Sequence, residues 1–262
     1  MITLRRILLP VLGALLMWVE ASAKVPEYTN EHLSYRVTYK WGIIQKQAGS
    51  AQFTLRRTPT DYEAVLTART QPWADRIFQV RDTLSGRMRL GDMAPTLYVK
   101  STHEGGEYRH DVIRYSFTGD RMVANCERFK IDKKGRQSVT DTILSAPMPG
   151  TDMLSVYYLV RRLPFDDMKP GTMAKAAIFS GKKIEQLAVK YNGIETLKLN
   201  DREYRCYKIN FTFSSERMKN SSAPMWAWIS TDGQRVPVKL IGELPIGEIQ
   251  VLLNDSSPKK KK

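Results

Sequence analysis

Apolar and polar residues alternate along most of the chain. In LSYRVTYKW, the residues Leu33, Tyr35, Val37, Tyr39 and Trp41 fall on one side of an extended backbone. Alternation with a period of two is typical of a β-strand that buries one face. Similar stretches recur to the end of the chain, and breaks that contain glycine separate most of them. Many short strands at such spacing predict a large antiparallel sheet.

One stretch departs from this alternation. TDMLSVYYLVRRLPF, residues 151–165, carries apolar residues around most of a helical circumference, and a helix that is apolar on nearly every side is buried. Asp152 is placed to cap the start of the helix, and Pro164 is placed to end it. We therefore predict a mainly β fold, a large curved antiparallel sheet or an open barrel or sandwich, with one short buried helix at about residues 152–163.

Asp152 and Ser155 also resemble a fragment of a serine hydrolase. A serine nucleophile needs a base against its hydroxyl and an oxyanion hole, and the sequence has no G-x-S-x-G elbow. We interpret Asp152 as a cap and Ser155 as a small residue that allows close helix–sheet contact. We predict no catalytic residues and no cofactor.

The N-terminus has the pattern of a secretory signal peptide. Arg5 and Arg6 precede an apolar run, and Ala21-Ser22-Ala23 is a small-x-small cleavage site. The apolar run is shorter than the ~20 residues that a membrane-spanning helix needs. We expect cleavage after residues 1–23, export to the periplasm, and a mature chain that is not an integral membrane protein.

The rest of the chain is predicted to form one β-rich domain, residues 24–254. Its two β halves, at about 31–145 and 174–254, are joined by the helix. Residues 255–262 end in four lysines and are predicted to be a disordered basic tail.

The chain is basic, with a net charge of +14. Lysine and arginine are interleaved with apolar residues along the strands, which is typical of solvated strand faces. The alternative is a basic surface that meets an anionic envelope component, a lipid or a glycolipid. Export argues against nucleic acid as the partner.

Three arginines are candidates for binding such a ligand. Arg161 and Arg162 end the helix and Arg81 lies in VRDTLSG, and their forked donors suit a phosphate or carboxylate. The alternative is a structural role, in which Arg161 pairs with Asp82 where the helix meets the sheet and fixes geometry.

Four aromatic residues are candidates for the wall of an apolar pocket. They are Trp226 and Trp228 on one predicted strand and Tyr157 and Tyr158 on the helix. Aromatic side chains often line ligand pockets, and the alternative is that all four belong to the core.

HEGGEYRH contains the weak candidates for a metal site, His103, His110 and Glu107. The spacing is not that of HExxH, and Gly105-Gly106 favours a hairpin turn with one histidine on each arm. We predict no metal.

The two cysteines, Cys126 and Cys206, lie in strand-like stretches. A disulfide between them is possible in an oxidising compartment, and two separate buried thiols are the alternative.

Several motifs, taken in order, resemble a family of exported proteins of Gram-negative bacteria that is known as a domain of unknown function. They are LSYRVTYKWGIIQKQAGSAQF, VRDTLSG, HEGGEYRHDVI, TDMLSVYYLVRRLPF and MWAWISTDGQRVPVKLIGELPIGEI. Gly49 matches a glycine that such proteins carry near the first hairpin. The resemblance covers nearly all of the mature chain and implies a mainly β envelope protein without an established catalytic activity.

Three functions fit these observations. The first is non-enzymatic binding of an amphiphilic or anionic envelope component in envelope assembly or maintenance. The second is a protein–protein scaffold in the envelope, and the third is a hydrolase or metal enzyme that uses His103 and His110.

Overall fold

The computed structural model describes residues 26–214, 225–244 and 246–254. The predicted signal peptide, 1–23, and the predicted basic tail, 255–262, lie outside the described residues. Within those described ranges, no helix is long and apolar enough to cross a bilayer.

The first half of the chain is an antiparallel meander in which each strand pairs with the next. The alternation of apolar residues explains this arrangement, because every second residue turns toward the concave side of the sheet. Its strands are β1 (Glu31–Trp41), β2 (Ile44–Arg57), β3 (Asp61–Thr70), β4 (Val80–Arg89), β5 (Pro95–Glu104), β6 (Glu107–Thr118), β7 (Arg121–Ile131) and β8 (Gln137–Pro147). The short helix α1 (Pro72–Asp75) lies between β3 and β4.

The second half begins with a short strand and the internal helix and then returns to long strands. Its elements are β9 (Gly150–Thr151), α2 (Val156–Arg161), the 3-10 helix η1 (Phe165–Asp167), β10 (Met173–Phe179), β11 (Ile184–Leu199), β12 (Arg202–Ser214), β13 (Met225–Ser230), β14 (Pro237–Glu243) and β15 (Glu248–Leu253).

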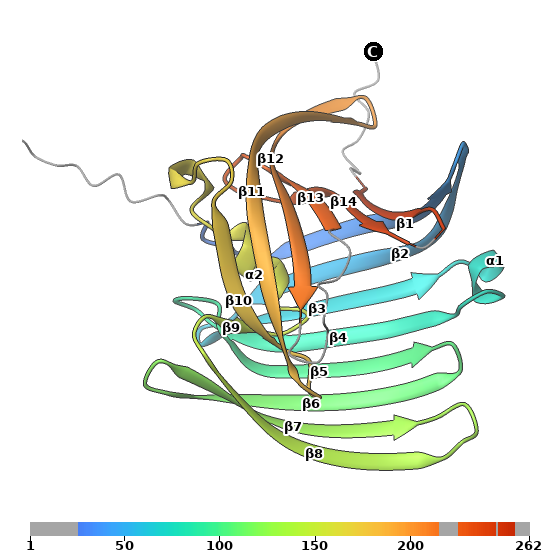
Figure 1. The fold of residues 1–262 in the computed structure, drawn as a ribbon, viewed down its shortest axis with the longest axis vertical. Coiled ribbons are helices and arrows are strands. Elements are labelled where there is room, and N and C mark those ends of the chain that lie inside the picture. The colour runs from blue at the N-terminus through green and yellow to red at the C-terminus, as the bar shows by residue number, and fades with distance from the viewer. Residues whose placement is uncertain (1–25, 215–224, 245, 255–262) are drawn as a thin grey trace, which may run out of the picture.

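The two halves join because the first strand pairs with the last. β1 pairs with β15 in antiparallel register, with Tyr35 opposite Leu253 and Val37 opposite Val251. The described residues thus form one 15-stranded sheet that runs from β8 through β1 and β15 to β9. The sheet curls into a nearly closed barrel around α2 (Figure 1). The predicted mainly β fold with one buried helix is confirmed.

Helix α2 is packed on two sides. Leu154 and Tyr158 belong to the hydrophobic core of the first half, whereas Val156, Leu159 and Val160 pack against the core of the second half. The helix therefore fills the centre of the barrel and connects the two cores.

The helix begins later than predicted, because its predicted first turn is a side-chain-capped turn. One carboxylate oxygen of Asp152 accepts hydrogen bonds from the backbone N–H groups of Leu154 (2.8 Å) and Ser155 (2.7 Å). The other accepts one from the hydroxyl of Ser155 (3.1 Å). Asp152 thus caps the turn that precedes α2, whereas the N-cap of α2 itself is Ser155, and the bonds between Asp152 and Ser155 are structural.

Two of the breaks seen in the sequence are bulges within strands. Ala48 is an extra residue where the β1–β2 register shifts, and Gly49 is needed there because a Cβ would lie 2.6 Å from the carbonyl oxygen of Arg69. The register of β11 and β12 shifts in the same way between Tyr191 and Ile194. A glycine inside a strand often marks such a bulge or a close backbone approach.

Cys126 and Cys206 are both free and buried, so the possible disulfide does not form. They lie on β7 and β12, which are not neighbours in the sheet. Burial raises the pKa of the Cys126 thiol to about 11 and that of the Cys206 thiol to about 12, which keeps both protonated and unreactive at neutral pH.

Candidate functional site

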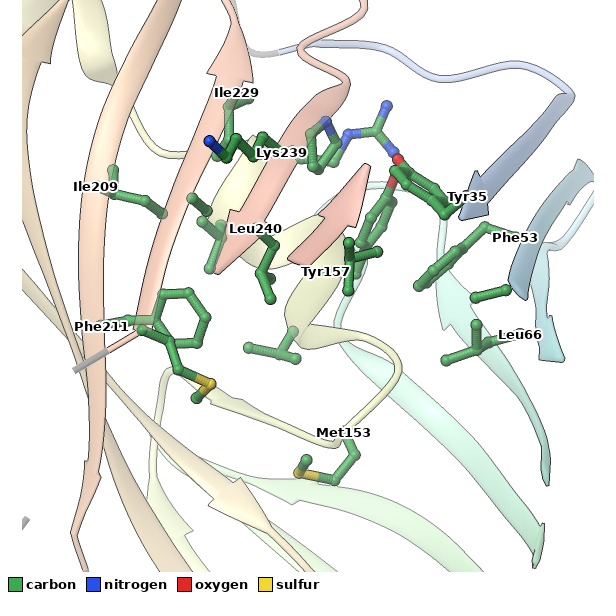
Figure 2. Close-up of a pocket in the computed structure, with 18 of the residues that line it drawn as sticks. Tyr35, Phe53, Leu66, Met153, Tyr157, Ile209, Phe211, Ile229, Lys239 and Leu240 are labelled. Atoms are coloured by element: carbon green, nitrogen blue, oxygen red, sulfur yellow. The ribbon is translucent and has the colours of Figure 1, made fainter. Parts of the chain in front are cut away.

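A cavity of about 450 Å³ lies between α2 and the concave face of the sheet. Phe53 and Leu66 border it on one side and Ile209 and Phe211 on the other (Figure 2). Its walls come from β1–β3, from α2 and from β11–β15. The volume falls within the range of about 300–1,000 Å³ that is usual for small-molecule sites.

The cavity wall is almost entirely carbon. Among the described residues, the cavity is lined by apolar side chains, by Tyr35 and Tyr157, and by two basic residues, Arg161 and Lys239. The hydroxyl groups of Tyr35 and Tyr157 lie 2.9 Å apart and hydrogen-bond to each other. Burial raises the pKa of Tyr157 to about 12, so this pair stays neutral. A polar ligand group inside the cavity would therefore find few partners.

Arg161 borders the cavity, but its guanidinium is already engaged. It forms a two-pronged ion pair with Glu31, at 2.9 and 2.6 Å, and donates to the backbone carbonyls of Gln234 and Arg235. The ring of Tyr28 lies 4.3 Å from the guanidinium carbon. The predicted pairing with Asp82 is wrong, because Glu31 at the start of β1 takes that place. Arg161 thus ties α2 to the start of β1 and to the connection between β13 and β14.

The other two candidate arginines lie away from the cavity lining. Arg162 donates to the carbonyl of Gly91 at 3.0 Å. Arg81 forms an ion pair with Asp75 at 2.7 Å, at the end of the sheet where α1 lies. The structure therefore does not bring the three candidate arginines together into an anion site.

The four aromatic candidates are also divided. Tyr157 lines the cavity and stacks on Phe53, with ring centres 4.3 Å apart. Tyr158 is fully buried in the core of the first half. Trp226 and Trp228 belong to a separate cluster with Cys206 and Leu252, on the opposite face of β13 from the cavity.

The alternation of β13 explains the position of the two tryptophans. Met225, Ala227 and Ile229 line the cavity, so the residues between them point outward. Lys239 pairs with Trp228 across β13 and β14. It lines the cavity, but its ammonium lies on that outer face, 5.1 Å from the centre of the Trp228 ring. Burial lowers the pKa of Lys239.

The candidate metal ligands do not converge on one point. His110 contacts the hydroxyl of Ser101 at 2.9 Å, and the ring of His103 lies 4.6 Å from that of Tyr108. Glu107 is ion-paired with Arg109 and Lys130. The predicted turn at 105–106 is confirmed. No group of three or more potential ligands occurs in the part of the chain that the structure describes.

Sequence reasoning missed a polar cluster on the concave face of β4–β7. Asp111 is almost completely buried, with Lys100 Nζ at 3.2 Å and Arg128 Nε at 3.6 Å from its carboxylate oxygens. Neither contact has hydrogen-bond geometry. On the same face, burial and the nearby Glu104 carboxylate raise the pKa of Asp82 to about 7. The sequence carries one signal for this cluster, the charged residues that alternate in VRDTLSG and RHDVIRYSF. The same alternation is typical of strands with one face in solvent, so it does not identify a buried cluster.

The carboxyl groups of Asp82 and Asp152 make the stability of the fold depend on pH. Asp82 has a folded pKa of about 7 and Asp152 one of about 6, both above the ordinary value near 4. A raised carboxyl pKa stabilises the protonated folded form, so this contribution is present below about pH 4 and is lost as pH rises to about 7. We expect Asp82→Asn to melt at a higher temperature than the wild type at pH 8, with little difference at pH 4.

Thermal unfolding followed by circular dichroism measures this effect. Asp141→Asn, at an exposed position on β8, is the matched control and should keep the wild-type pH dependence. If Asp82→Asn melted below the wild type at pH 8, the assignment of a raised pKa to Asp82 would be wrong.

Fold and cavity together define a class of protein: a β-barrel-like protein with an internal helix and an apolar cavity beside it. The chain belongs to the family described as "Protein of unknown function (DUF3108)", whose model matches residues 34–254. The resemblance of the sequence motifs to a family of unknown function is thereby confirmed. None of the curated proteins compared with the chain matches it.

A solved structure shares this fold. It is the crystal structure of a beta-barrel-like protein of domain of unknown function DUF1849 from Brucella abortus, with a TM-score of 0.61 and 7% sequence identity. The match covers 87% of this chain and 97% of that one. At so low an identity, the likeness shows the fold alone.

Proposed function

We propose that the protein binds an amphiphilic molecule, an envelope lipid or glycolipid, by enclosing its apolar chain in the cavity beside α2. The observation that carries the proposal is the cavity itself, with a volume of about 450 Å³ and walls of apolar side chains. Burying an acyl chain there removes it from water at about 0.8 kcal/mol per methylene. The binding would be non-enzymatic and would serve envelope assembly or maintenance after export to the periplasm.

The head group of such a ligand would stay outside the cavity. Inside, Tyr35 and Tyr157 satisfy each other and Arg161 is held by Glu31, so the wall has little to offer a charged group. Met153 lines the cavity and is 45% exposed, which places it where the cavity meets solvent. The net charge of +14 favours an anionic head group over a cationic one.

A fluorescent fatty acid tests the proposal directly. cis-Parinaric acid emits strongly in apolar surroundings, and we expect saturable binding of one molecule per chain that unlabelled palmitate competes away. Lack of saturable binding, or binding that palmitate leaves unchanged, would refute the proposal.

A scaffold function is the second candidate, and strand β8 favours it. β8 is an end strand of the sheet and exposes Val139 and Ile143, which are suited to pairing with a strand of another protein. A stoichiometric protein partner in place of a bound amphiphile would support this function.

A further inference from the structure

One end of the barrel carries a concentration of exposed apolar side chains. Seven of the thirteen large hydrophobic residues that are exposed among the described residues lie there. They occupy the β1–β2 loop, the β3–β4 connection that contains α1, and the β14–β15 loop. These seven residues, here called the apolar tips, are Trp41, Ile43, Ile44, Ile77, Phe78, Leu244 and Ile246.

The three loops are neighbours, because β15 pairs with β1, β1 with β2, and β2 with β3. α1 and the β1–β2 loop lie on the same side of the molecule (Figure 1). Hydrogen bonds hold the loops in place: the hydroxyl of Tyr39 donates to the carbonyl of Ile246 at 3.0 Å, and Nε1 of Trp73 donates to the carbonyl of Gln47 at 2.8 Å. The apolar tips are therefore presented together.

The form of this surface suits a lipid bilayer. The tips project from separate loops, with Ile43 fully exposed and Ile77 79% exposed, so each can enter the boundary between head groups and acyl chains. Lys46 lies over the ring of Trp73 at 4.4 Å, and tryptophan and lysine are both typical of the membrane interface.

The charges nearby are compatible with an anionic surface. Lys40 is ion-paired with Glu248, and Asp75 with Arg81, so these two acidic side chains are offset by bases. The net charge of +14 for the whole chain adds a long-range attraction to anionic lipid.

The cavity extends toward this same end. Val37 and Ala68 line it from β1 and β3, four residues before Trp41 and two before the end of β3 at Thr70. Met225, the first residue of β13, lines it as well. Strands that form the cavity wall thus lead directly into the loops that carry the apolar tips.

We infer that the apolar tips dock the protein on the surface of a lipid bilayer, so that the cavity takes its ligand from the membrane or returns it there. The docking stands on the exposed loops, whereas the transfer of ligand rests on the proposed function.

Co-sedimentation with vesicles tests the docking. The probe is vesicles of phosphatidylcholine, alone or mixed with phosphatidylglycerol, and the variant is Ile43→Ser/Ile77→Ser/Ile246→Ser, with one change in each loop. The control is Val65→Ser/Met173→Ser/Ile194→Ser, which alters three exposed residues on β3, β10 and β11. Circular dichroism melts establish that all chains are folded.

We expect the wild type and the control to partition onto vesicles, more strongly with phosphatidylglycerol. The partition coefficient of the loop variant should be at least about tenfold lower than that of the wild type, because three isoleucines no longer enter the bilayer. Equal partitioning of the loop variant and the wild type, or no partitioning of the wild type, would overturn the inference. A wild-type dimer that becomes a monomer in the loop variant would also overturn the inference, because the apolar tips would then contact a second copy of the chain.

The two proposals fail separately in this design. If the inference alone is wrong, the wild type still binds cis-parinaric acid in solution but does not bind vesicles. If the proposed function alone is wrong, the chain binds vesicles through its tips but does not bind the fatty acid in solution.

Discussion

Replacing Arg161 with methionine is expected to lower the free energy of unfolding by about 3–5 kcal/mol, the usual cost of breaking a buried ion pair. The Arg161 side chain is completely buried and that of Glu31 is 6% exposed. The variant leaves the Glu31 carboxylate buried without its partner. It also removes the donors to the carbonyls of Gln234 and Arg235. Urea denaturation followed by tryptophan fluorescence measures the change.

Two further variants make this prediction specific. Arg162→Met changes the adjacent arginine, whose hydrogen bond to Gly91 is exposed, and should cost less than about 1 kcal/mol. Arg161→Met/Glu31→Leu replaces both charges with apolar groups and should recover much of the lost stability. If Arg161→Met were as mild as Arg162→Met, the central role of Arg161 in the fold would be wrong.

Filling the cavity is expected to weaken ligand binding by at least about tenfold while leaving the fold intact. Ala51 on β2 and Ala227 on β13 line the cavity from different strands, and Ala51→Phe/Ala227→Phe places two rings in the empty space. Each displaced methylene of a bound chain loses about 0.8 kcal/mol, and every 1.4 kcal/mol is about tenfold in affinity. Loss of contact for two methylenes therefore weakens cis-parinaric acid by about tenfold or more.

The matched control for this variant is Val65→Phe. Val65 lies on the outer face of β3, between the buried Ala64 and the cavity residue Leu66, and is 36% exposed. It should bind the fatty acid as the wild type does. Filling an existing cavity should not lower the free energy of unfolding. If Ala51→Phe/Ala227→Phe were folded and bound the fatty acid as the wild type does, the cavity would not be the binding site.

The fold was predictable from the sequence because its signals are local. Alternation with a period of two identified the strands, and the apolar circumference of residues 151–165 identified the buried helix. The bulges at Ala48 and near Asn192 are harder to predict, because a glycine in a strand and a glycine in a turn look alike in sequence. Only pairing partners distinguish them: Gly49 lies against the backbone of Arg69.

The candidate site was less predictable because it is built from distant strands. The pairing of β1 with β15 brings Tyr35 and Val251 to one cavity, and no local pattern encodes it. Which face of β13 turns inward depends on its register with β12 and β14. The sequence alone therefore left Trp226 and Trp228 as candidates for either the pocket or the core, whereas Ala227 and Ile229 line the pocket. Likewise, the partner of Arg161 lies 130 residues away.

Native mass spectrometry of the protein, purified without detergent from the cells that make it, shows whether the cavity beside α2 holds an amphiphile. We expect a chain that carries one amphiphile, which solvent extraction removes. Val65→Phe should carry it too, whereas Ala51→Phe/Ala227→Phe should not. A wild-type chain with no bound amphiphile, or an amphiphile retained equally by Ala51→Phe/Ala227→Phe, would contradict the proposed function.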